Sequence, residues 1–193
     1  MVTVSTLQQS PRTYHHGDLR SALVAAGLRA LEAVDLEALS VRQLAREVGV
    51  SATAVYRHFP DKAALLHALA GAGLEQLGQY QLEAAERAGP SGAFSATGRA
   101  YVRWALANPA LFRLIFSRAE PIGETVFGQS LAARLLQSSA RAASGNDDAR
   151  ARQLVVQAWA LVHGLAMLML DGQLPPDEEL IDRVIDPKTL FPA

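Results

Sequence analysis

The amino-acid sequence predicts an all-α fold, and three observations lead to that prediction. Apolar residues recur three and four positions apart, the spacing of one helix face, along most of the 193 residues. No sustained alternation of apolar and polar residues indicates a strand, and no Asn-Gly or Asp-Gly turn joins β-branched runs. Glycine, proline and helix-capping residues divide the apolar pattern into segments of helix length.

The first four helices are predicted from apolar stripes bounded by capping residues. Ser40 and Ser51 each precede a short stripe and are expected to cap free N–H groups, and Gly49 between them is expected to turn the chain. Pro60 ends the third helix, and Asp61 is expected to cap the fourth. The predicted helices cover about 18–34, 41–48, 52–59 and 62 onward.

The remaining helices are separated by clear breaks. Gly89, Pro90 and Gly92 interrupt the pattern first, and Asn108 followed by Pro109 is expected to cap and restart the chain. An acidic, proline-containing tail after the last long helix is expected to be loosely structured. The predicted helices here cover about 94–107, a short piece from 109, about 123–143 and about 147–170.

Composition limits the possible functions. Half of the residues are hydrophobic, enough for a packed core, and the absence of cysteine excludes disulfides and thiol catalysis. Residues 1–10 lack the basic start of a signal peptide, and the apolar stretch 154–170 falls short of the ~20 residues that span a bilayer. We therefore expect a cytoplasmic protein without a membrane partner.

Charge is distributed unevenly along the chain. The formal net charge of −1 argues against a protein whose whole surface is coated with nucleic acid. Segment 40–62 nevertheless carries four basic residues against two acidic ones, whereas segment 171–186 carries six acidic residues against one basic one. The basic segment is the candidate for contact with a nucleic acid.

Segment 40–59 meets the physical requirements of a helix-turn-helix. Two short capped helices flank a glycine, and the apolar stripe of the first packs against the second at a steep angle. Burial of Val55 and Phe59 would turn the small N-terminal end of the second helix outward, so that its backbone can approach base edges in a major groove. The outward residues would be Ala52, Thr53, Tyr56 and Arg57. Spacing alone fits a plain pair of packed helices equally well.

The basic segment and its surroundings resemble the DNA-binding domain of the TetR (tetracycline-repressor) family. The resemblance covers about the first seventy residues, and its matching runs are Tyr14–Arg20, Ser40–Ala45, Gly49–Ser51 and Val55–Lys62. It implies that Ser51 starts the reading helix, that phosphates are held by one set of side chains and that bases are read by another. The phosphate set is Ser40, Tyr56, His58 and Lys62, and the base set is Arg42, Ala52, Thr53 and Arg57. The chemistry agrees, because an arginine can donate two hydrogen bonds to guanine and small methyl groups can contact thymine.

Sparser motifs downstream resemble a TetR C-terminal domain type named for its Trp-His-Gly sequence. They are Tyr101–Val102 with Ala105, Asn108–Phe112, and Trp159 with Val162–Gly164. The resemblance implies a flexible N-terminal arm at 1–12, a three-helix helix-turn-helix DNA-binding domain at 13–72, and a helical ligand-binding and dimerisation domain at 73–193. It implies a sequence-specific transcriptional regulator, a repressor that a small apolar ligand releases from a palindromic operator. The alternative is a helical small-molecule-binding protein whose helix-turn-helix no longer binds DNA.

An aromatic and methionine group in the C-terminal half is the candidate ligand site. Its few polar atoms suit an apolar cavity in which Tyr101 and His163 orient a hydrophobic or aromatic effector. The same residues could simply form core, because buried aromatic side chains dominate core packing. The set is Tyr101, Trp104, Phe112, Phe116, Phe127, Trp159, His163 and Met167.

The helix at 147–170 is apolar nearly all round over its second half, which predicts a homodimer. We expect a second copy to cover it together with the helix at 123–143, with Leu161 and Leu165 in the interface. No metal site is expected, because the five histidines lie in separate segments. Neither a GxSxG elbow nor a phosphate-binding glycine loop is present, so we expect no catalytic residues and no cofactor.

Overall fold

The computed structural model describes residues 19–116, 128–145 and 147–186, and within these ranges every regular element is a helix. The prediction of an all-α fold is confirmed. The predicted arm at 1–12 and Phe127 lie outside the described residues. In chain order the elements are α1 (Leu19–Ala33), the 3-10 helix η1 (Leu36–Ala38), α2 (Val41–Val48), α3 (Ala52–His58), α4 (Lys62–Ala88), α5 (Ala93–Ala107), α6 (Pro109–Phe116), α8 (Leu131–Ala143), α9 (Asp148–Leu170) and α10 (Glu178–Val184).

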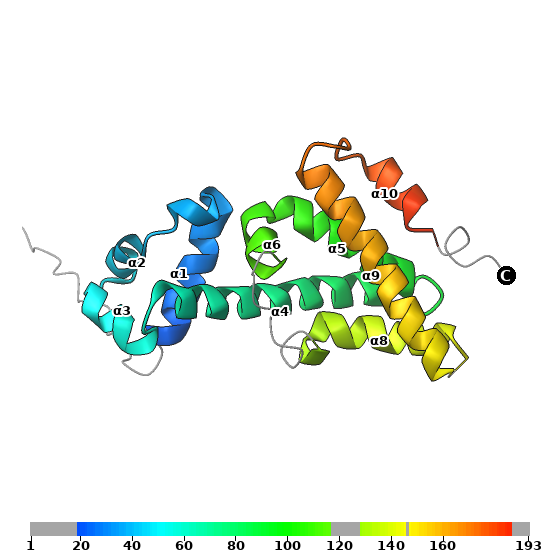
Figure 1. Cartoon of the computed structure of the whole chain (residues 1–193), viewed down its shortest axis with the longest axis horizontal. Coiled ribbons are helices and arrows are strands. Elements are labelled where there is room, and N and C mark those ends of the chain that lie inside the picture. Colours follow the sequence, from blue (N-terminus) through cyan, green and yellow to red (C-terminus); the bar gives the residue numbers. More distant parts are fainter. Residues whose placement is uncertain (1–18, 117–127, 146, 187–193) are drawn as a thin grey trace, which may run out of the picture.

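Helices α1, α2 and α3 form one end of the molecule and surround the first turns of α4 (Figure 1). Leu23 on α1, Leu44 on α2 and Val55 on α3 are fully buried and belong to the same apolar core. Gly49 joins α2 to α3 with a φ of 80°, the left-handed conformation that glycine adopts without strain. These two short helices and their turn form the predicted helix-turn-helix.

Side-chain caps follow the prediction at two helix starts and depart from it at a third. The Ser51 hydroxyl and the Asp61 carboxylate each accept a hydrogen bond from the backbone N–H three residues later, at 3.2 and 2.7 Å. Ser40 precedes α2 in extended conformation, but its hydroxyl makes no capping hydrogen bond. The prediction of a side-chain cap was wrong there, and the Gln43 N–H donates to the Ser40 carbonyl alone, at 3.1 Å.

Helix α4 runs along the length of the molecule and connects its two ends (Figure 1). Its 27 residues correspond to about 40 Å at 1.5 Å per residue. The first turns pack against α1, while α5, α6 and α8 pack along the rest. The predicted boundary between 72 and 73 therefore falls inside a continuous helix.

The other end of the molecule is a helical bundle built from α4, α5, α8 and α9. Two glycines on α4 allow its neighbours to approach closely. A Cβ added at Gly73 would lie 2.8 Å from Leu111, and one at Gly78 would lie 2.7 Å from the backbone nitrogen of Ala132. Asn108 was predicted to cap α6, but its side chain donates to the last turn of α5 at 2.9 Å and so caps that helix instead.

Helix α10 corrects the prediction that the acidic tail is loosely structured. Asp177 caps it by accepting hydrogen bonds from two backbone N–H groups, at 2.8 and 3.4 Å. Ile181 and Ile185, four residues apart, are buried against the bundle. Of the prolines that suggested an unstructured tail, Pro175 and Pro176 precede the helix, and Pro187 and Pro192 lie outside the described residues. The two isoleucines supply the apolar face that holds the helix.

Candidate nucleic-acid interface and ligand cavity

Helix α3 buries one face and exposes the other. Val55 and Phe59 are in the core, whereas Tyr56 is 50% exposed and Arg57 and His58 are exposed beside it. Thr53 is also exposed on the first turn. The polar face of this helix is thus turned to solvent, as the prediction required.

The cations around α3 are available to a partner. Arg42 on α2, Arg57 on α3 and Lys62 at the start of α4 are exposed, and none of them forms an ion pair with another described residue. The cations of α1 are engaged differently. Arg29 bonds to Glu47 at 2.8 Å, and the Arg20 guanidinium lies 5.1 Å from the centre of the Phe59 ring. The helix-turn-helix surface therefore carries three exposed, unpaired cations, where phosphates would approach.

The small residues at the start of α3 leave its backbone open to close approach. Ala52 is half-buried, and the Ser51 hydroxyl is occupied by its capping hydrogen bond. Ser40, whose hydroxyl makes no cap, lies half-buried at the start of α2. All nine residues of the predicted DNA-binding set thus lie on α2, α3, their caps and the first residue of α4, at one end of the molecule.

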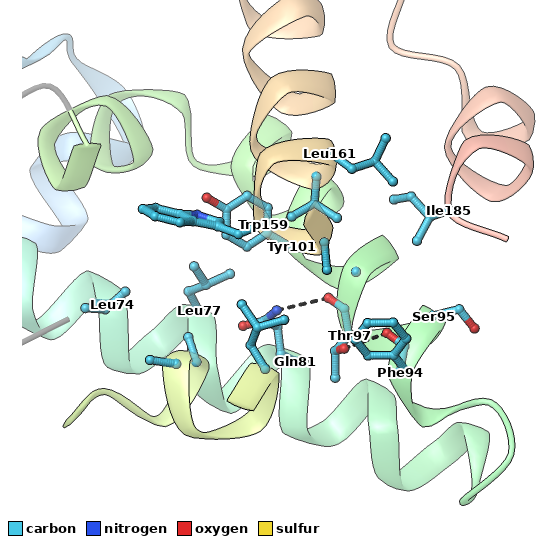
Figure 2. Close-up of a pocket in the computed structure, with 16 residues that line it drawn as sticks. Leu74, Leu77, Gln81, Phe94, Ser95, Thr97, Tyr101, Trp159, Leu161 and Ile185 are labelled. Carbon is cyan, nitrogen blue, oxygen red and sulfur yellow. Dashed lines mark hydrogen bonds between the residues drawn. The ribbon is translucent and has the colours of Figure 1, made fainter. Parts of the chain in front are cut away.

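A small apolar cavity of about 50 Å³, partly open to solvent, lies between α4, α5, α8 and α9, with the residue after α10 on one side (Figure 2). Its polar groups are few and its walls carry no charged side chain among the described residues. The cavity is lined by Leu74, Leu77, Gln81, Phe94, Ser95, Thr97, Gly98, Tyr101, Ala132, Ala133, Leu136, Ala158, Trp159, Leu161, Val162 and Ile185. Such a lining suits a neutral, largely apolar molecule.

Most of the predicted aromatic set comes together as a packed cluster beside the cavity. Ring centroids lie 4.8 Å apart for Phe112 and Phe116, 4.9 Å for Phe116 and His163, and 5.7 Å for Tyr101 and Phe112. Phe112 is 0% exposed, so it fills core rather than a hollow. Of the predicted set, Tyr101 and Trp159 line the cavity, and Trp104 is buried in the core without lining it.

Tyr101 and His163 satisfy each other. The Tyr101 hydroxyl lies 2.9 Å from Nδ1 of His163, a hydrogen-bonding distance. Burial raises the pKa of the Tyr101 phenol and lowers the pKa of the His163 imidazole, so both groups are neutral near pH 7. The two predicted ligand-orienting groups are therefore already paired in this structure.

Phe116, His163 and Met167 line a second, wider hollow of about 270 Å³ between the two ends of the molecule. Its walls include Asp35 and Glu37 near η1 and Arg113 on α6. An apolar molecule there would strip water from charged groups, which costs free energy. The inner cavity is therefore the better site for an apolar ligand, although it is smaller.

Sequence reasoning missed Gln81, Phe94 and Ile185 as cavity residues. Gln81 follows Leu74 and Leu77 at positions that share one buried face of α4. A polar residue in an apolar register was the available signal for Gln81. Ile185 carried no such signal, because the tail that contains it was not expected to fold against the bundle.

Comparisons with known proteins agree with this geometry. Residues 23–69 match the domain described as bacterial regulatory proteins, tetR family, and residues 94–187 match the tetracyclin repressor-like C-terminal domain. A stretch of 53 residues is 46% identical to the tetracycline repressor protein class C of Escherichia coli. That match covers 28% of this chain and 24% of the repressor, so the chain spans about a quarter of that relative's length.

Solved structures share the fold. A protein with unknown function from Rhodococcus sp. RHA1 superimposes with a TM-score of 0.69 at 34% identity, over 91% of this chain and 93% of that one. A tetR-family transcriptional regulator from Streptomyces coelicolor gives 0.59 at 21% identity, over 86% and 76% of the two chains. The multidrug binding protein EbrR, complexed with imidazole, gives 0.59 at 19% identity, over 90% and 95%.

A helix-turn-helix with unpaired cations on its exposed face, joined by one long helix to an all-α bundle, defines a helical DNA-binding regulator. Matches to both the N-terminal and the C-terminal domain place the chain more narrowly. The protein belongs to the TetR family and is a DNA-binding transcriptional regulator.

Proposed function

We propose that this protein is a cytoplasmic repressor that binds a palindromic operator as a homodimer and leaves it when a small apolar molecule occupies the inner cavity. One observation carries the proposal. Helix α4 begins with Lys62 at the DNA-binding surface and continues without a break to Leu74, Leu77 and Gln81 in the cavity wall. A change in the cavity wall therefore acts on the same rigid element that supports the DNA-binding helices.

The DNA-binding part of the proposal is supported by charge and shape. Lys62 and Tyr56 present polar atoms to solvent beside a helix of major-groove width. Arg42 stands on α2 with its guanidinium unpaired, free to form two hydrogen bonds with a guanine. The unpaired cations favour DNA binding over the alternative of a helical binding protein that has lost it. A repressor role is supported by the 46% identity to a tetracycline repressor.

The dimer is supported by the exposed face of α9. By length and composition, this helix could cross a membrane. Only 28% of its most apolar 18-residue stretch is buried within the protomer. Val156 is 63% exposed and Leu168 is 46% exposed. The first turns of α9 carry basic and acidic residues, and the helix packs on α5 and α8. Both features favour contact of this face with a second copy of the protein rather than with lipid.

The interface positions expected from the sequence need revision. Leu165 is 5% exposed and packs inside its own protomer, and Leu161 lines the cavity. Val156 and Leu168 lie twelve residues apart on α9 and, with Ala160 and Gly164 between them at four-residue steps, mark the outward stripe. A Cβ added at Gly164 would meet no atom of its own protomer, which leaves room for a partner helix.

Release by a ligand follows from differential binding. An effector that prefers a conformation with a shifted α4 would change the distance between the two helix-turn-helix units of the dimer. These units must fit major grooves about 34–36 Å apart or a multiple of that distance. The structural relative EbrR was crystallised with imidazole, a small ring compound. The apolar lining of the inner cavity supports a neutral ring compound here as well.

The experiment that tests this function begins with selection of bound sequences from a random double-stranded DNA pool. The expected result is one palindromic consensus, bound by the wild-type protein and lost in a Tyr56→Ala, Lys62→Ala double variant. Gln76, exposed on α4 away from the DNA-binding surface, offers the matched control Gln76→Ala. Recovery of no consensus sequence would reject the proposal and favour the binding protein without DNA affinity.

A further inference from the structure

We propose that the inner cavity selects neutral apolar molecules that carry a hydrogen-bond donor, and that this donor binds Oε1 of Gln81. The inference rests on the proposed function, which assigns the effector to this cavity, and it adds the chemical feature by which the effector is recognised. Gln81 lies on α4, so the residue that reads the ligand belongs to the helix that supports the DNA-binding end.

Gln81 is held in place with one half of its amide unused. The side chain is 7% exposed, and its Nε2 donates to the Thr97 carbonyl of α5 at 3.0 Å (Figure 2). A carbonyl can only accept, so the NH₂ side of the amide must face Thr97 and the oxygen must face the other way. Oε1 is buried without a hydrogen-bond partner among the described residues. A buried amide oxygen in this state costs free energy that a donor on a ligand would recover.

The other polar groups of the cavity offer a ligand no free hydroxyl proton. The Ser95 hydroxyl donates to the Gly92 carbonyl at 3.2 Å, and the Thr97 hydroxyl donates to the Phe94 carbonyl at 2.7 Å. The Tyr101 hydroxyl pairs with His163, and the Trp159 side chain interacts with the same phenol. The Ser95 oxygen also accepts from Arg99 at 3.4 Å. Among the described residues, Oε1 of Gln81 is thus the acceptor left without a partner, which predicts a ligand that donates rather than accepts.

The charge and the volume of the cavity narrow the class of ligand further. A carboxylate or an ammonium group would lose its hydration in walls that hold no opposite charge among the described residues, so ions are disfavoured. The volume of about 50 Å³ is below the ~300 Å³ of typical ligand sites. A bound molecule therefore either displaces a wall or extends into the open mouth of the cavity. Small aromatic compounds with one N–H or O–H group fit these requirements.

The test uses matched probes that differ in the donor. Indole is compared with benzothiophene, and 2-naphthol with 2-fluoronaphthalene, by calorimetric titration of the full-length protein without DNA. We expect the donor compound of each pair to bind about tenfold more tightly, as one additional buried hydrogen bond provides. In Gln81→Met, which keeps the length of the side chain and removes the acceptor, the preference should fall to about twofold or less. The exposed Gln76→Met is the matched control and should keep the preference.

In the titrations, three outcomes overturn the proposal: equal binding within each pair, a preference that Gln81→Met leaves intact, or no binding by any of the four probes. If Gln81→Met fails to fold, the comparison in the wild-type protein decides alone. The operator assay separates this inference from the proposed function. Release of DNA by benzothiophene as readily as by indole would reject the donor rule and leave the ligand-released repressor standing.

Discussion

Lys62 and Arg42 carry the same charge, but their positions predict different contacts with DNA. Lys62 lies at the first residue of α4 with no described ion-pair partner, where it can reach a phosphate. Lys62→Ala should weaken binding to all DNA sequences alike and lower the log-log salt slope by roughly 0.9. Fluorescence anisotropy at several salt concentrations measures both effects. A slope equal to that of the wild type would show that Lys62 touches no phosphate.

Arg42 is predicted to read a base. Arg42→Ala should relax the preference at one operator position, at a cost of ~1–3 kcal/mol of discrimination, because a bidentate contact to guanine is lost. Competition between the operator and single-base variants of it measures this change. Equal losses on every sequence would instead assign Arg42 to the phosphate contacts.

His163 should make stability depend on pH. Burial lowers its pKa below the ordinary 6.5, so the unfolded chain binds more protons than the folded chain in the interval between the two values. The free energy of unfolding should therefore fall as the pH decreases below about 6.5, and this slope should be smaller in His163→Gln. Urea unfolding at several pH values measures it, with His67→Gln on the exposed face of α4 as the control. Identical slopes in wild type and His163→Gln would contradict the prediction.

Single residues were predictable where one local rule decides. Gly49 and the caps at Ser51 and Asp61 follow from backbone conformation and nearest neighbours. Ser40 departed from the prediction, because residue type and an extended backbone permit a side-chain cap without fixing the rotamer that makes it. The apolar register of α4 offered a signal for Gln81, but it could not reveal that the Thr97 carbonyl binds only the Nε2 half of the Gln81 amide.

Among the α-helices, α10 is the one that the sequence analysis did not predict. Its ion pairs to α5 join Arg103 to Glu178 at 2.7 Å and to Asp182 at 3.1 Å, and Arg99 to Asp182 at 3.5 Å. All of these side chains are at least partly exposed. Such pairs contribute about 0–1 kcal/mol. Burial of Ile181 and Ile185 therefore holds the helix against the bundle. This attachment depends on tertiary packing, so it could not be predicted from the composition of the tail.

This balance gives a prediction for α10. Ile181→Ala removes a fully buried side chain, a change that costs ~2–5 kcal/mol in a packed core, so it should accelerate amide exchange in 178–184 strongly. Arg103→Ala should accelerate it much less. Hydrogen exchange followed by mass spectrometry compares the two variants. Greater acceleration by Arg103→Ala would mean that the ion pairs, and not the apolar contacts, fix α10.

At the scale of the whole molecule, the exposed stripe of α9 predicts self-association. A Val156→Asp, Leu168→Asp double variant would bury unpaired carboxylates in the dimer at a cost of several kcal/mol, and it should be a monomer with weak operator affinity. Tyr80→Asp, which places the same charge on exposed α4, is the control. Sedimentation at micromolar concentration measures the state. A monomeric wild-type protein would rule out the dimer.

The overall plan of the molecule could be predicted further than its cavity. Apolar periodicity and the motifs at 40–62 indicated an all-α chain with a helix-turn-helix at one end, because those features are local. The aromatic set was expected to surround a hollow. Phe112 and Trp104 fill core instead, since the position of a void depends on how four helices pack and not on any one of them.

Coupling between the cavity and the DNA-binding surface through α4 would make the whole molecule act as one ligand-controlled unit. An effector is first identified by quenching of Trp159 fluorescence in a Trp104→Phe background. Its affinity is then measured for the free protein and for the operator-bound protein, and the affinity of the protein for the operator is measured with and without the effector. Both affinities should fall by the same factor, about 5- to 150-fold, because coupling between two sites is reciprocal. A ligand that binds tightly in the cavity and leaves operator affinity unchanged would contradict it.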